Sequence, residues 1–518
     1  MKKFFRILCF IMASVLTLAC FAGCSENTDD PVDQNVSDTT EAEETTEPVD
    51  NTIKMFYDDR KTPEELIGKA ASSVEFKDQV VESDSIDGSG KDTEVLIYDN
   101  ATNRIIATGV GTATVVADGV EYPVKVSAAP ITIVLITGHS LGEGSQGNAT
   151  ESVVCEAGQV YSTSRLQDIV QKTPAQVVGI GFGEAKRPAG IDALTDERRL
   201  QGRPGVAGGL GLEWTRLTGE KIWIVNYAVG GSCINEWVEG SEFHNNALIG
   251  LNFVSKIVKK EVAAGHFIYK GTEHVNFSCA NFGYKNVSYN DDLLIKWHDS
   301  MIKGFENGST EDIDGDGKID VPKNIGYVPC WPTKDLEYDE DAPLIYYRAA
   351  SAEFPNVYMA SSLPLLWGTD ASVKANFPEI DYTIQSGKTP IRPTTVATAN
   401  ADGVHLTQLG YNAQGQDIAR SLYAFTRTEN APEKVEIYNI TTNQTGVLVA
   451  APITTIKGRT LQFALVSTPL CSSNYTIEAS SHFQISQTFK IKAVEKGEGT
   501  VTVKSGDKVV ATLNITVK

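Results

Sequence analysis

Two short segments of the sequence carry side chains that could cooperate in nucleophilic catalysis. Ser140 lies in a glycine-rich turn (137–144, TGHSLGEG) that directly follows an apolar run. Such a turn can expose a serine hydroxyl and direct backbone N–H groups at an oxyanion. Asp402 and His405 stand three residues apart, so the carboxylate can accept the Nδ1–H of the imidazole and leave Nε2 free as a base. These residue types predict acyl transfer through a serine nucleophile.

A third segment, 226–237 (NYAVGGSCINEW), places two adjacent glycines after another apolar run. Glycines at a strand end allow the backbone to approach a ligand closely. Taken singly, each of the three segments is also typical of an ordinary structural turn. The prediction of a site therefore depends on all three being brought together.

The elements that would position these segments are predicted from apolar runs that alternate with longer polar–apolar stretches. Continuous β-branched runs are typical of strands covered on both faces, and residues 291–305 have helical spacing. This alternation predicts an α/β fold with a doubly wound parallel sheet, whose sites form at the carboxyl ends of the strands. The predicted strands are residues 131–136, 176–180, 222–225, 266–269 and 356–360.

In this order the three segments resemble the blocks of the SGNH (GDSL) hydrolase family. Segment 138–144 is similar to the first block, Asn226 with Gly231 to the second, and Asp402 with His405 to the last. Within the family, segment 230–237 is most similar to the sialate O-acetylesterase-like branch, which removes acetyl groups from sugars. The resemblance covers roughly residues 131–427 and implies a flavodoxin-like, three-layered arrangement for them.

The resemblance implies a role for each residue. Ser140 would be the nucleophile, His405 its base and Asp402 the residue that orients the base. The N–H groups of Ser140 and Gly231 would form the oxyanion hole, and no cofactor would be needed for catalysis.

The sequence departs from the family pattern at three places. His139 replaces the Asp of the first block, and Leu141 replaces the Asn that is usual in this branch. The third block corresponds to residues 270–274, where the side-chain donor to the oxyanion would be Thr272 or Glu273. An ionised Glu only accepts hydrogen bonds. The sequence therefore leaves open a weakened site, and with it a glycan-binding or adhesin function instead of catalysis.

The first 52 residues predict export and anchoring. Residues 1–23 combine a basic start with an apolar run, which is typical of a secretory signal, and they resemble a lipoprotein signal with Cys24 as the lipid-bearing residue. Residues 24–52 are predicted to be a disordered tether, because segment 25–52 has ten carboxylates, no Lys or Arg, and little to bury. The expected location is a bacterial cell surface or a periplasm-facing membrane.

Residues 53–129 and 433–518 flank the predicted hydrolase domain (130–428) and alternate polar and apolar residues, which predicts half-buried strands. In the first flank, 111–116 and 122–126 surround an Asp118-Gly119 turn that predicts a hairpin. In the second, 499–503 and 509–517 surround a turn at 505–507. The C-terminal stretch resembles bacterial Ig-like domains, and the N-terminal one is similar to a shorter relative.

Segment 312–320 (DIDGDGKID) predicts a structural calcium loop. It has oxygen ligands at alternate positions and resembles the EF-hand and dockerin-type loop over nine residues. Its twelfth position is Lys323 instead of the usual bidentate Glu. The expected ligands are the carboxylates of Asp312, Asp314 and Asp316, the backbone carbonyl of Lys318, and Asp320.

Charge narrows the expected partners. The 518-residue chain has 66 acidic and 45 basic side chains, a formal charge of −21. This excess of carboxylates argues against a nucleic-acid partner, since phosphate binding needs clustered Lys and Arg. Acetylated glycans are the expected substrate, and the lipid anchor is the expected contact with the membrane.

Overall fold

The computed structural model describes residues 51–145, 147, 151–163, 204–277, 291–328, 356–361, 405–406, 408–427, 434–439, 441, 447–468, 475–485, 490–505 and 507–518. The predicted signal segment, Cys24 and nearly all of the predicted tether lie outside these residues. Among the described helices, none combines the length and the apolar character that a membrane crossing requires.

The core is a parallel sheet of six strands in the order β13-β12-β11-β8-β10-β9. Leaving out the edge strand β9, the order by chain position is 2-1-3-4-5, as in flavodoxin-like doubly wound sheets. The predicted α/β class with a parallel sheet is therefore confirmed. The strands are β8 (Ala129–Gly138), β9 (Val160–Thr163), β10 (Lys221–Asn226), β11 (Phe267–Phe277), β12 (Pro322–Tyr327) and β13 (Val357–Met359).

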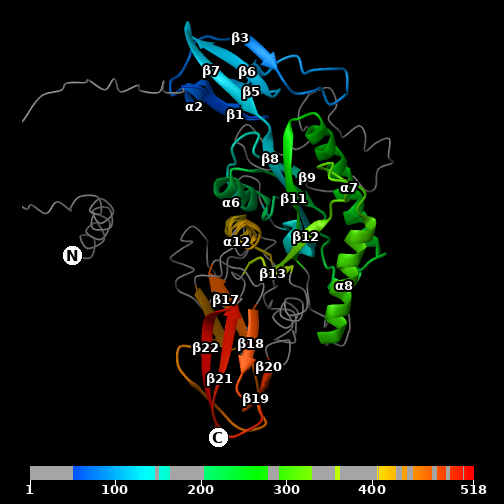
Figure 1. The fold of residues 1–518 in the computed structure, drawn as a ribbon, viewed down its shortest axis with the longest axis vertical. Helices are drawn as coiled ribbons and strands as arrows, with labels where there is room; N and C mark the ends of the chain where they lie inside the picture. The colour runs from blue at the N-terminus through cyan, green and yellow to red at the C-terminus, as the bar shows by residue number, and fades with distance from the viewer. Residues whose placement is uncertain are drawn as a thin grey trace, which may run out of the picture. The chain divides into compact units, whose positions relative to one another are not determined.

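Helices cover both faces of this sheet (Figure 1). α6 (Ala207–Thr218) and α12 (Gln408–Arg427) lie on one face, and α7 (Glu242–Ala263) and α8 (Asp291–Gly308) on the other. Successive side chains of β8 point to opposite faces, so its residues divide between two hydrophobic clusters. Ile131, Ile133 and Leu135 pack with the α7 and α8 side, and Val134 and Ile136 with the α6 and α12 side.

The predicted elements agree with the structure where apolar runs marked them. The strands predicted at 131–136, 222–225 and 356–360 coincide with β8, β10 and β13, and the helix predicted at 291–305 is α8. The strand predicted at 266–269 is only the beginning of the longer β11. Strands β9 and β12 were not predicted, because neither contains a continuous apolar run. The segment 176–180 lies outside the described residues.

Glycines let α6 and α12 touch at their backbones. A Cβ atom on Gly209 would lie 2.1 Å from the carbonyl oxygen of Asn412, and one on Gly415 would lie 2.2 Å from that of Val206. Both distances are far below van der Waals contact. Any larger residue at either position would push α12 away from α6, and α12 follows directly after the segment that holds His405.

Residues 53–127 form a four-stranded sheet (β1-β7-β6-β3) and a three-stranded sheet (β2-β5-β4) around a common hydrophobic cluster. The predicted hairpin is present, with Asp118 (φ 50°) and Gly119 (φ 80°) in the left-handed conformation of a type I′ turn. The elements are β1 (Ile53–Phe56), β2 (Arg60–Lys61), α2 (Pro63–Ile67), β3 (Val74–Val81), β4 (Leu96–Asp99), β5 (Arg104–Ala107), β6 (Gly111–Ala117) and β7 (Val120–Ser127).

Residues 434–517 form a five-stranded sheet (β15-β14-β17-β20-β19) and a four-stranded sheet (β16-β22-β21-β18), which also share a hydrophobic cluster. The two strands predicted around residues 505–507 are the antiparallel pair β21 and β22. Membership of the Ig-like family stays a prediction for both β regions. The strands are β14 (Lys434–Asn439), β15 (Val447–Leu448), β16 (Ile453–Thr455), β17 (Thr460–Thr468), β18 (Tyr475–Ala479), β19 (Phe483–Ile485), β20 (Lys490–Ala493), β21 (Gly497–Ser505) and β22 (Lys508–Val517).

Buried charges fasten the N-terminal sheets to the amino ends of the parallel strands. Lys221, the first residue of β10, is 1% exposed; its Nζ lies 2.9 Å from a carboxylate oxygen of Asp59 and donates to the carbonyl of Gly158 at 2.7 Å. Nearby, the hydroxyl of Tyr161 donates to Asp58 at 2.9 Å. A buried charge is tolerated only when it is paired and hydrogen-bonded, so these contacts hold the two regions together specifically.

His266 is the centre of a second buried cluster at the same edge. Its Nε2 lies 2.6 Å from Asp92 of the N-terminal region, its Nδ1 lies 2.8 Å from Glu261 of α7, and its ring stacks on Tyr57 at 4.0 Å. Burial by itself lowers the pKa of His266, but the hydrogen bonds to Asp92 and Glu261 outweigh it and raise the pKa to about 9. The imidazole is therefore a buried cation at neutral pH.

This cluster predicts how stability depends on pH. Replacing Asp92 by Asn removes one anion from the buried imidazolium, which should cost about 3–5 kcal/mol at pH 7. Because the pKa of His266 is raised, its contribution is fully present below the ordinary value of about 6.5 and is lost as the pH rises through about 9. The difference in melting temperature between Asp92→Asn and the wild type should therefore narrow at pH 10.

Glu121→Gln provides the control. It breaks the exposed Lys77–Glu121 pair of the same region and should cost at most about 1 kcal/mol. Equal losses for the two variants at pH 7 would contradict the buried clamp.

Candidate active site

Ser140 opens a short helix, α3 (Ser140–Glu143), at the carboxyl end of β8. The chain turns sharply there around the last residue of β11. Gly138 has φ 110°, and a Cβ on it would lie 2.4 Å from the carbonyl oxygen of Phe277, which also accepts the N–H of His139 at 3.0 Å. Only glycine fits this combination of positive φ and close approach. The predicted turn after a buried strand is confirmed.

The hydroxyl of Ser140 is within hydrogen-bonding distance of His405. The distance between Ser140 Oγ and His405 Nε2 is 2.7 Å, although 265 residues separate the two in the chain. This is the geometry expected of a serine nucleophile and its general base. Asp402, the residue expected to orient His405, lies outside the described residues.

The second predicted segment also reaches Ser140. Asn226, the last residue of β10, donates from Nδ2 to the carbonyl of Gly142 at 2.8 Å, and the N–H of Val229 donates to the carbonyl of Gly138 at 2.7 Å. These contacts bring Gly230 beside Ser140: a Cβ on Gly230 would lie 3.8 Å from Ser140 Cβ and 3.0 Å from a carboxylate oxygen of Glu143. Gly231, the predicted oxyanion donor, follows with φ 75°.

The sequence did not single out Gly230 or Glu143. The glycine pair in the 226–237 segment indicated a close approach, but only the packing of this loop against α3 shows which of the two glycines faces Ser140. Glu143 carries no signal of its own, since a lone acidic residue in a helix is usually a solvated one.

The expectation that Thr272 or Glu273 donates to the oxyanion is wrong. Within β11 these residues pair with Ile133 and Val134, whereas Phe277 pairs with Gly138 at the carboxyl edge. At about 3.3 Å per residue they lie on the order of 15 Å from that edge. The predicted block was misplaced because the strand continues to Phe277, well beyond the apolar run at its start.

Both residues have structural partners instead. The hydroxyl of Thr272 hydrogen-bonds with that of Tyr269 at 2.7 Å, and Glu273 accepts from Asn324 at 2.7 Å. Burial raises the pKa of Glu273 to about 7, against a smaller opposing effect of the hydrogen bond from Asn324.

His139, the residue directly before Ser140, has a structural role. Its Nδ1 accepts the N–H of Leu141 at 3.3 Å and so caps α3. Burial, with a smaller contribution from His405, lowers the pKa of His139 to about 3. The imidazole is therefore neutral at physiological pH.

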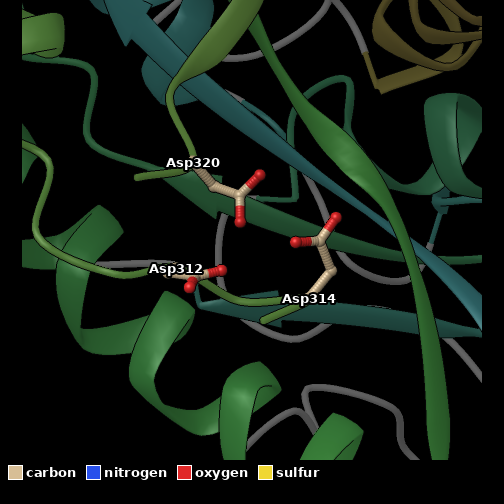
Figure 2. Close-up of side chains that lie close together, drawn as sticks. All are labelled: Asp312, Asp314 and Asp320. Atoms are coloured by element: carbon tan, nitrogen blue, oxygen red, sulfur yellow. The ribbon is translucent and has the colours of Figure 1, made fainter. Parts of the chain in front are cut away.

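The acidic loop between α8 and β12 is the second candidate site (Figure 2). Carboxylate oxygens of Asp312, Asp314 and Asp320 lie within 4.8 Å of one another and face a common space. Asp316 is not in this group; its carboxylate accepts the N–H of Lys318 at 2.8 Å and pairs with the Lys318 side chain. Three of the predicted calcium ligands are therefore brought together.

No family model matches the chain, and no curated protein matches it. A carbohydrate acetylesterase from Xanthomonas citri aligns over 90% of this chain and 95% of its own, with 14% identity and a TM-score of 0.34. A protein from Arabidopsis thaliana aligns over 57% and 99%, with 13% identity and a TM-score of 0.30. At these scores the likeness establishes neither a family nor an activity.

The position of Gly230 gives a test of the site. Its backbone is outside the positive-φ region, so Gly230→Ala should fold, but the added methyl group would crowd Ser140 and Glu143. We expect the rate of phosphonylation of Ser140 by a small phosphonylating reagent to fall about tenfold or more, with little change in melting temperature. Gly119→Ala, in the open turn between β6 and β7 of the N-terminal region, should leave labelling unchanged. Unchanged labelling of Gly230→Ala would contradict this placement.

Proposed function

We propose that this protein is a serine esterase that removes O-acetyl groups from carbohydrates. The observation that carries the proposal is the 2.7 Å contact between Ser140 Oγ and His405 Nε2 at the carboxyl edge of a parallel sheet. In such sheets this edge is where ligands bind. The order of the segments and their resemblance to the SGNH hydrolases point to the same class of reaction.

The proposed mechanism is acyl transfer in two steps. His405 takes the proton of Ser140 as Oγ attacks the ester carbonyl, while Asp402 holds the imidazole. The N–H groups of Ser140 and Gly231 stabilise the oxyanion. His405 then protonates the departing sugar hydroxyl, and water, deprotonated by His405, hydrolyses the acetyl-enzyme to acetate.

The substrate class rests on the chain's expected location and on the resemblance to the sialate O-acetylesterase-like branch. An exported protein anchored through Cys24 meets polymers outside the cell, so acetylated glycans fit better than cytosolic metabolites. The membrane contact would be the lipid alone.

Removing the nucleophile tests the activity. Ser140→Ala should abolish acetate release from an aryl acetate, because it removes the hydroxyl that accepts the acetyl group. Ser145→Ala, a change of the same size in the same turn, should retain activity. Wild-type turnover by the Ser140→Ala variant would refute the proposed nucleophile.

A glycan-binding protein without catalysis is the second candidate function, because two flanking β regions accompany the site and Thr272 and Glu273, the expected side-chain donors to the oxyanion, pair with residues far from Ser140. Acetate release and binding, measured side by side on one panel of acetylated glycans, separate the two functions. Binding without turnover would favour the adhesin.

We further propose that the acidic loop binds calcium as a structural ion. The three converging carboxylates carry the proposal, together with the alternating spacing of the segment. Ile313 of the loop is buried in the core beneath α7 and α8. A bound cation would therefore stiffen the connection between α8 and β12.

Calcium should raise the melting temperature of the wild type, with an affinity in the range of about 10⁻⁴–10⁻³ M that extracellular sites show. Asp314→Asn should lose this gain, because it removes one of the three converging carboxylates. Asp316→Asn, in the same loop but outside the group, should keep most of it. Identical melting in EDTA and in millimolar calcium would refute the site.

A further inference from the structure

The beginning of α12 presents three hydrogen-bonding side chains to backbone carbonyls. Gln408, Tyr411 and Asn412 occupy positions i, i+3 and i+4 and therefore share one face of the helix. The Tyr411 hydroxyl donates to the carbonyl of Ser145 at 2.8 Å, Gln408 Nε2 to that of Gly205 at 2.8 Å, and Asn412 Nδ2 to that of Glu151 at 2.9 Å. All three side chains are buried.

One of these bonds reaches the turn that carries the nucleophile. The N–H of Ser145 donates to the carbonyl of Ser140 at 3.0 Å, so Ser145 closes the turn that Ser140 opens. Tyr411 thus ties α12 to this turn, and Tyr411 itself follows His405 by only six residues. The base and the nucleophile are connected twice: by their own hydrogen bond and by this one.

A second connection matters because the glycine contacts constrain α12 in only one direction. Gly209 and Gly415 set how closely α12 approaches α6, but close contact alone leaves sliding along the helix axis and rotation about it. The bonds from Gln408, Tyr411 and Asn412 lead to three separate segments and oppose both movements. A displacement of about 1 Å in a reacting pair can cost on the order of a hundredfold in rate.

We propose that Tyr411 is a positioning residue, supported by Gln408 and Asn412, which holds His405 Nε2 within reach of Ser140 Oγ. The proposal rests on the proposed esterase function for its kinetic consequences. Its structural consequence, the distance between Ser140 Oγ and His405 Nε2, can be measured independently of any activity.

The test compares Tyr411→Phe with Tyr161→Phe. Both tyrosines are buried, and each loses a single hydroxyl whose bond is of similar length, 2.8 Å to Ser145 and 2.9 Å to Asp58. Tyr161 lies in β9 and bonds to the N-terminal region, at the amino ends of the strands. Both variants should lose a few degrees of melting temperature. Tyr161→Phe therefore controls for the effect of lost stability alone.

Only Tyr411→Phe should affect catalysis. We expect kcat for an aryl acetate to fall about tenfold, with KM unchanged and with the midpoint of the acid limb of the pH–rate profile unchanged. Tyr161→Phe should keep the wild-type kcat. Crystal structures of the wild type and Tyr411→Phe should show the Ser140–His405 hydrogen bond in the first and a longer separation in the second.

A Tyr411→Phe variant that keeps this hydrogen bond and a kcat within about twofold of wild type would overturn the proposal. If the phenylalanine variant does not fold, Gln408→Met, which removes the neighbouring bond to Gly205, takes its place with the same expected outcomes. A wild-type protein that has the Ser140–His405 hydrogen bond but no esterase activity would refute the proposed function and not the role of Tyr411. In that case the comparison of the two crystal structures still tests whether Tyr411 positions His405.

Discussion

The burial of β8 on both faces is the constraint on which the rest of the structure depends. Strand β8 pairs with β10 on one edge and β11 on the other, and nearly all of its ten residues are buried. The side chains on its two faces belong to the two hydrophobic clusters against which the helices pack. Its amino end continues from β7 of the N-terminal region, and its carboxyl end presents Ser140. Any change that shifts β8 would displace both ends together.

The amino ends and the carboxyl ends of the parallel strands have different physical roles. At the amino ends of the strands, the buried side chains of Lys221 and His266 each pair with one carboxylate of the N-terminal region, Asp59 and Asp92. Such pairs are specific because a partner left alone would be an uncompensated charge. At the carboxyl ends of the strands, the backbone of Gly230 and the side chain of His405 both lie close to Ser140. The N-terminal sheets thus contribute rigidity at the edge opposite to the site.

Histidines illustrate how the environment, more than the residue type, sets the chemistry. The hydrogen bonds that His266 donates to two carboxylates make it a cation despite its burial. His274 and His298 lie in the layer between the sheet and α8 and bond to the hydroxyls of Thr137 and Tyr327 instead. For these two, burial lowers the pKa to about 3, so they are neutral polar groups in the core. The sequence shows seven histidines of one type, and only packing distinguishes them.

By itself the sequence determined the local features: the apolar run that must be a buried strand at 131–136, the glycine turn at Ser140, the hairpin at Asp118-Gly119 and the spacing of the acidic loop. These follow from side-chain burial and backbone freedom within a few residues. Tertiary structure decided which residues surround Ser140, because these contacts depend on pairings between distant segments. The register of β11 against β8 excluded Thr272 and Glu273 from the site, the packing of the 226–237 loop selected Gly230, and the approach of α12 to α6 placed His405 on Ser140. No pattern within one segment predicts these contacts, because each distance joins two segments that are far apart in the sequence.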